Sequence, residues 1–93
     1  MKATLDGHVL AESDDIVVNG GYAYFPAAAV RAERLQKAAK TASDLACPHG
    51  VQFYDVVIDG ARTPRAAWSY EAPRPAMQAV GGRFGFWHEV SVD

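Results

Sequence analysis

The residues best suited to do chemistry are a cysteine and a histidine two positions apart, Cys47 and His49, within Cys-Pro-His-Gly. In an extended corner, side chains at positions i and i+2 point the same way, so the His49 imidazole could activate the Cys47 thiol as a nucleophile. The simpler interpretation is a small buried cysteine beside a solvated histidine, because free cysteines are among the most buried residues. The spacing therefore gives a catalytic pair only as a hypothesis, and the sequence identifies no third group that would orient the histidine.

A second catalytic candidate is Glu71, which follows Tyr70 at the end of an apolar run. In a dry cleft this carboxylate could serve as a general base. Glutamate is rarely buried, so a solvated strand end is the simpler interpretation.

Aromatic residues are the candidates for ligand binding. Along a cleft they could line a pocket for a planar or apolar small molecule, with phenol and indole groups as polar handles. The candidates are Tyr24, Tyr54, Trp68 and Tyr70, with Trp87 in the same set. The simpler interpretation is core packing, which any β domain of this size requires.

The sequence predicts no metal site and no cofactor. A closed zinc site needs four ligands. The chain has a single cysteine and no Cys-x-x-Cys, so Cys47, His49, His8 and His88 could form such a site only if distant strands converged.

Length and charge limit the function further. Ninety-three residues predict a single domain spanning 1–93. A net charge of -2 with dispersed basic residues argues against nucleic acid as a partner. No apolar run approaches the roughly 20 residues needed to cross a membrane, and a lone cysteine fits a reducing compartment, so we expect a cytoplasmic protein, monomeric or homodimeric.

The first 25 residues predict an antiparallel meander. Asp6-Gly7 should join strands at 2–5 and 8–12 through a type I′ turn, which pairs Leu5 with His8, Thr4 with Val9 and Ala3 with Leu10. Asn19-Gly20-Gly21 should join further strands at 16–18 and 22–25. The next segment is rich in helix formers, so a helix is expected over 26–34, followed by a loop at 41–44.

The second half predicts more strands. The run 51–58 is β-branched and aromatic, and both of its faces are largely apolar, as is typical of a central strand. Cys47 to Gly50 should form the corner that opens it, and Asp59-Gly60 the turn that ends it. We then expect a connector at 61–64, a strand at 66–71, a helical turn at 75–80 and a last strand at 84–92. About seven short strands favour a small antiparallel sandwich or half-open barrel.

Several motifs together resemble the bacterial "domain of unknown function 427" family across nearly the whole chain. In order, they are Leu10-Ala11-Glu12-Ser13, Tyr24-Phe25-Pro26, Cys47-Pro48, Tyr54 with Asp59-Gly60, Ala67-Trp68-Ser69-Tyr70 with Pro73, and Phe86-Trp87. The resemblance implies a β-tent, in which two antiparallel sheets lean together over a cleft. It also implies a strand through Leu35, against the helical composition there.

Two features of the chain set limits on that resemblance. Family members usually carry a lysine between Cys-Pro and the glycine, whereas His49 is followed directly by Gly50. The family is sometimes labelled nucleotidyltransferase-like, but the chain has neither a Gly-Ser followed by Asp-x-Asp nor a phosphate-binding glycine loop.

The leading expectation is a small β domain that binds an unknown small molecule in an aromatic-lined cleft between sheets. One alternative is an enzyme that uses Cys47 or Glu71 in the same cleft. The other is a protein-interaction or structural domain with a filled interior and a flat apolar patch.

Overall fold

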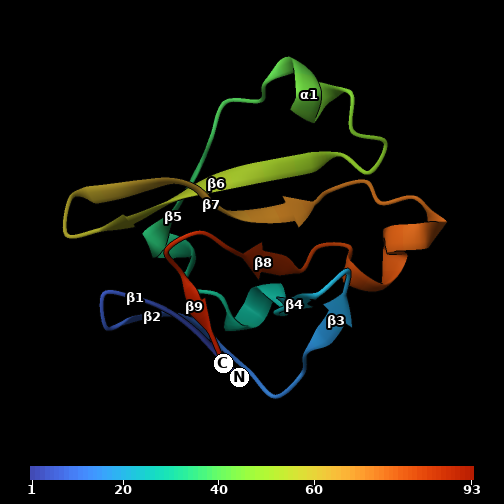
Figure 1. Ribbon diagram of the computed structural model, residues 1–93. Helices are drawn as coiled ribbons and strands as arrows, with labels where there is room; N and C mark the ends of the chain where they lie inside the picture. The colour runs from blue at the N-terminus through green and yellow to red at the C-terminus, as the bar shows by residue number, and fades with distance from the viewer.

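A computed structural model describes all of residues 1–93 and consists of three antiparallel sheets (Figure 1). One sheet has the order β2-β1-β9, from His8–Glu12, Lys2–Leu5 and Ser91–Val92. A two-stranded sheet pairs β3 with β4, at Val17–Asn19 and Tyr22–Tyr24. The largest has the order β5-β6-β7-β8, from Leu35–Lys37, Val51–Ile58, Ala61–Tyr70 and Phe84–Phe86. The mainly antiparallel β prediction is confirmed, with nine strands where about seven were expected.

Helical structure is confined to short turns. The only α-helix is α1 (Ala42–Leu45), and single 3₁₀ segments lie at Ala27–Ala29, Ala32–Arg34 and Pro75–Val80, the last called η3. The predicted helix over 26–34 was wrong, because an alanine-rich segment offers little apolar surface to bury and packing outweighs propensity. The strand at Leu35 that the resemblance implied is confirmed. The predicted loop at 41–44 was also wrong, because Thr41 and Asp44 form a capping box that starts α1.

The first hairpin has the predicted turn, and its strand pairing agrees with the prediction only near that turn. Asp6 and Gly7 have φ of 50° and 79°, as a type I′ turn requires. The predicted pairs Leu5 with His8 and Thr4 with Val9 are confirmed. Ala3 instead pairs with Ala11, because a bulge shifts the register one step beyond Thr4. The third strand lies at Val17–Asn19, one residue later than predicted.

The central strand is confirmed and carries the longest hairpin. The strand β6 lies between β5 and β7, and the Asp59-Gly60 turn pairs Ile58 with Ala61. The predicted connector at 61–64 was therefore wrong, because these residues belong to β7. Pro64 is accommodated at a bulge, where a residue without an N–H breaks no ladder hydrogen bond.

The predicted continuous strand at 84–92 was wrong as well. The strand β8 ends at Phe86, and the chain reverses through His88 at φ 58°. The strand β9 then pairs with β1 in the other sheet, so the two ends of the chain lie together (Figure 1). Trp87 still donates its backbone N–H to the Ala66 carbonyl oxygen of β7 over 3.0 Å, before the chain reverses.

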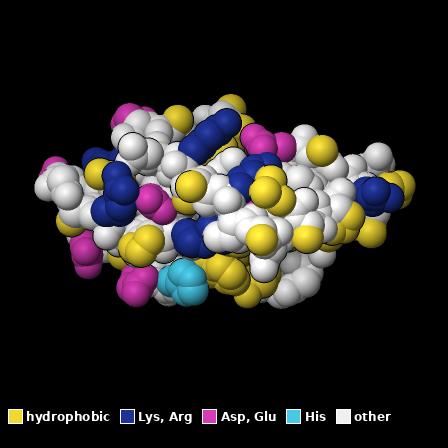
Figure 2. All heavy atoms as spheres, turned by 90° about the horizontal axis from the view of Figure 1, so that it is seen from above, with side chains coloured by type: hydrophobic (Ala, Val, Ile, Leu, Met, Phe, Trp, Pro, Cys, Tyr) yellow, Lys and Arg dark blue, Asp and Glu magenta, His cyan; other side chains and the backbone are white.

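Alternation along β6 separates two apolar clusters. Val56 and Ile58 point into the main core, which fills the space between the three-stranded and four-stranded sheets. Val51 and Phe53 point from the other face into a second cluster with Trp68. Acidic and basic side chains are interspersed on the face that Figure 2 shows, without a large field of one sign. The short β3–β4 sheet and η3 pack against the second cluster, and a cavity opens there.

Candidate functional site

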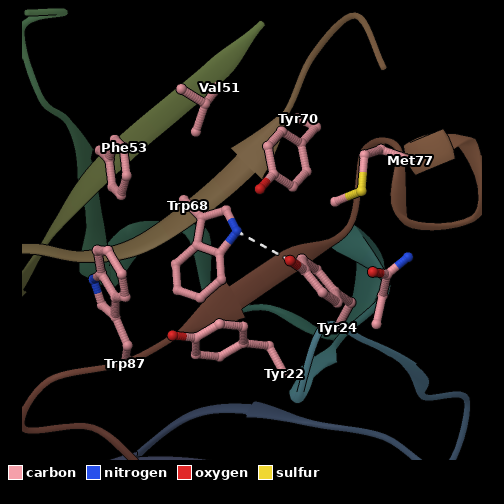
Figure 3. A pocket seen from close by; sticks show the side chains of 10 residues that line it. Tyr22, Tyr24, Val51, Phe53, Trp68, Tyr70, Met77 and Trp87 are labelled. Atoms are coloured by element: carbon pink, nitrogen blue, oxygen red, sulfur yellow. Dashed lines mark hydrogen bonds between the residues drawn. The ribbon is translucent and has the colours of Figure 1, made fainter. Parts of the chain in front are cut away.

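An aromatic-lined cavity of about 240 Å³ opens between the two-stranded and four-stranded sheets (Figure 3). Eight of its ten lining residues are hydrophobic. The lining residues, which define the aromatic cavity below, are Asn19, Gly20, Tyr22, Tyr24, Val51, Phe53, Trp68, Tyr70, Met77 and Trp87. Figure 3 shows Trp68 in the middle, with Phe53 and Trp87 to one side and Tyr24 and Tyr70 to the other.

The wall of the aromatic cavity is built by cross-strand neighbours. Phe53 on β6 lies opposite Trp68 on β7, and Trp68 lies opposite Gly85 on β8. A Cβ at Gly85 would lie 2.6 Å from the indole of Trp68, so the indole lies across the glycine. Without a side chain at Gly85, this large ring can cover the neighbouring strand and form a floor.

The opposite wall comes from β4. Two hydrogen bonds between Phe25 and Phe84, both 2.9 Å, join the end of β4 to β8 and bring its tyrosines over Trp68. The rings of Tyr22 and Tyr24 meet the indole edge-on, with centroids 5.0 Å and 5.9 Å away. Such edge-to-face contacts are the favoured arrangement of aromatic pairs. Tyr22 is 40% exposed and so marks the rim of the cavity.

The polar atoms of the aromatic cavity are few. The Trp68 indole N–H donates to the Tyr24 hydroxyl over 3.4 Å, as the dashed line in Figure 3 marks. The Trp87 indole N–H donates to the Arg65 carbonyl oxygen over 2.6 Å. Burial, reinforced by the neighbouring Tyr24, raises the pKa of Tyr70 to about 12, so its hydroxyl stays protonated at neutral pH. Tyr70 therefore offers an O–H group and no charge.

Cys47 and His49 do not line the cavity. Cys47 packs against the second cluster, and the ring of His49 lies 5.8 Å from that of Tyr70. The Gly50 N–H donates to the Cys47 carbonyl oxygen over 3.3 Å, so the corner is a tight turn and the expected extended geometry is absent. No hydrogen bond joins the Cys47 thiol to His49, whose Nδ1 accepts from the Arg74 N–H over 3.0 Å. The catalytic pair thus stays a prediction without a supporting contact.

Glu71 also lies outside the cavity. Its side chain is 43% exposed and sits 3.7 Å from Lys37 Nζ and 3.5 Å from Lys40 Nζ. The expected dry cleft around it is absent, and its surroundings are those of a solvated ion pair.

Of the four predicted ligand-binding residues, the structure brings three together. Tyr24, Trp68 and Tyr70 line the cavity, and Tyr54 does not. Tyr54 points to the opposite face of β6, where its ring packs 5.1 Å from that of Phe84. Burial, with a smaller effect of Glu71, raises the pKa of Tyr54 above its usual range.

Sequence reasoning missed Phe53, although a signal for it existed. The Asp59-Gly60 turn pairs Ile58 with Ala61, and counting back along both strands places Phe53 on the face of Trp68. The bulge adds two residues to β7. Because side chains alternate between faces every residue, a shift of two keeps Trp68 on the same face as Phe53. Tyr22 and Met77 carry no comparable signal, because they reach the cavity from β4 and η3 through tertiary packing.

No group of three or more Cys, His, Asp or Glu side chains converges in a way that could hold a metal ion. None of the helices has the length and apolar character needed to cross a membrane.

The sequence matches the family model described as a domain of unknown function (DUF427) over residues 1–93, the entire chain. The chain belongs to this family. No curated protein matches the DUF427 chain in sequence. Family membership therefore assigns no activity to the DUF427 chain, and its function has to be argued from the aromatic cavity.

Proposed function

We propose that this DUF427 domain binds a small molecule in the aromatic cavity. The observation that carries the proposal is an open concavity between the two-stranded and four-stranded sheets, with six aromatic side chains among its ten lining residues. Ligand sites are typically concave, mostly apolar and furnished with a few polar groups. An interaction domain with a filled interior would have no need of such a hollow.

The size of the cavity indicates the size of the ligand. At about 240 Å³ the cavity is just below the roughly 300 Å³ at which drug-sized pockets begin. We therefore expect a compact molecule, or one compact group of a larger molecule whose remainder lies outside the rim.

Intrinsic fluorescence can test the proposal directly. The chain has two tryptophans, and both Trp68 and Trp87 line the cavity, so no other indole contributes to the signal. A ligand should change their emission and, at about 100 times its Kd, raise the Tm by on the order of 10 °C. A metabolite library that changes neither the emission nor the Tm would contradict the proposal.

A pair of variants on one hairpin locates the site. Tyr22→Ala removes a rim residue and should weaken binding about tenfold or more, since it deletes one aromatic wall. Val18→Ala is the matched control, because Val18 is 68% exposed and does not line the cavity. Equal loss of affinity in both variants would place the site elsewhere.

A further inference from the structure

The aromatic cavity has no charged side chain among its lining residues. Its two indole N–H groups are already used, one by the Tyr24 hydroxyl and one by the Arg65 carbonyl oxygen. An anion entering the cavity would lose its water without meeting a cation or a free indole donor. The lining therefore favours a neutral or cationic group.

The angles between the rings exclude a slot for a flat ligand. Tyr22 and Tyr24 stand nearly perpendicular to Trp68, at 87° and 88°. The only stacked pair, Phe53 and Trp87, has centroids 5.7 Å apart, and a flat ring between them would need roughly 7 Å, twice the contact distance of carbon atoms. Walls that meet at right angles suit a compact, rounded group.

Aromatic faces attract cations, and one ring of this cluster already holds one. The guanidinium carbon of Arg65 lies 4.1 Å from the centroid of Phe53. Two hydrogen bonds of 2.9 Å and 3.1 Å tie this guanidinium to Asp44, so it stays in place and its charge is balanced. The remaining rings have no cation of the chain over them.

The acceptors in the lining are the neutral oxygens of Asn19 and three tyrosines, and none is a carboxylate that could pair with an ammonium N–H. A primary ammonium needs acceptors for three N–H donors, whereas a quaternary ammonium has no N–H and is bound by ring faces alone. We propose that the aromatic cavity takes the quaternary ammonium group of a small molecule. This inference rests on the proposed function and specifies its ligand class.

Isothermal titration calorimetry with three matched probes tests whether the cavity prefers a positively charged ligand. Choline and 3,3-dimethylbutan-1-ol have the same shape, with nitrogen in one and carbon in the other, and ethanolamine keeps the charge without the methyl groups. We expect choline to bind about tenfold more tightly than either. Equal binding of choline and its carbon analogue would overturn the charge selection while leaving a small-molecule site in place.

The two proposals can fail separately. If none of the three probes binds but other library compounds change tryptophan emission, the ammonium inference is overturned and the cavity remains a binding site. If nothing in the library binds, both are overturned. In Tyr22→Leu, choline affinity should fall several-fold while that of the carbon analogue changes little, because leucine keeps an apolar contact but has no ring face to attract a cation. Equal losses for both probes in this variant would count against the inference.

Discussion

At the scale of single residues, the absence of a side chain at Gly85 lets the Trp68 indole lie across β8 and form the floor of the aromatic cavity. A Cβ there would lie 2.6–3.0 Å from three atoms of the Trp68 indole, and a real Cβ does not approach so closely. Gly85→Ala should lower the free energy of unfolding by about 1–3 kcal/mol, as is usual for overpacking. Urea unfolding measures the loss, and altered tryptophan emission would report the displaced ring.

A second substitution supplies the control. In a Trp68→Leu background the added methyl group meets no indole, so Gly85→Ala should cost much less there than in the wild type. The same cost in both backgrounds would show that Trp68 is not the obstacle.

Asp44 is the residue whose charge should govern stability in acid. Hydrogen bonds from Arg65, with those from Thr41, lower the pKa of the Asp44 carboxyl from 3.8 to about 2. A depressed pKa means that the contribution to folding is present above about pH 4 and is lost as the pH falls toward 2. The Tm difference between wild type and Asp44→Asn should shrink over that interval.

Asp14→Asn is the control variant, because the Asp14 side chain is exposed and the substitution removes the same charge. The Tm of Asp14→Asn should follow that of the wild type over the same range. A difference for Asp44→Asn that does not change between pH 5 and pH 2 would contradict the assigned role of the Arg65 contact.

At the scale of elements, the β6–β7 hairpin depends on a bulge that one side chain stabilises. Asp55 is 8% exposed, and its Oδ1 accepts the N–H of Arg65 over 3.0 Å, where Arg65 has a φ of 53°. Asp55→Ala would leave this partly buried N–H without a partner and should cost about 1–3 kcal/mol of unfolding free energy.

Asp55→Asn keeps an oxygen in the same place and should therefore cost clearly less than Asp55→Ala. Urea unfolding of the two variants decides the point. If both lose the same stability, the hydrogen bond to the bulge contributes little and the carboxylate acts through its ion pair with Arg62, which lies 3.6 Å away.

Local signals in the sequence predicted most of these elements. The Asp6-Gly7 turn predicted the first hairpin, and β-branched and aromatic composition located the central strand, because these preferences act over a few residues. The predicted helix over 26–34 failed where composition and packing disagree. The strand at 84–92 failed because the reversal at His88 serves a long-range pairing that no local pattern records.

At the scale of the whole molecule, the four-stranded sheet has two apolar faces, and they are covered to different extents. The three-stranded sheet closes the main core, whereas the other face meets only a short hairpin, η3 and the Trp87 segment. Four of the cavity residues could be anticipated as a set of aromatic side chains, namely Tyr24, Trp68, Tyr70 and Trp87. The strands that enclose the cavity could not, because it arises where β4 meets β8 through the contact between Phe25 and Phe84.

Trp68 illustrates why core and site cannot be separated here. Its side chain is 4% exposed, and it lines the aromatic cavity at the same time. Trp68→Ala should cost about 3–5 kcal/mol, as for other buried aromatic residues, and the loss of binding would then be confounded with unfolding. Exposed Tyr22 is the better probe of binding for this reason.

The central claim is that the aromatic cavity is a binding site, and the two indole N–H signals in a proton–nitrogen correlation spectrum test it most directly. Titration with a fragment library that includes the ammonium probes should shift both signals, since Trp68 and Trp87 line the same cavity. Fragments that bind the folded protein while both signals stay unchanged would contradict the claim, and so would a library in which no fragment binds.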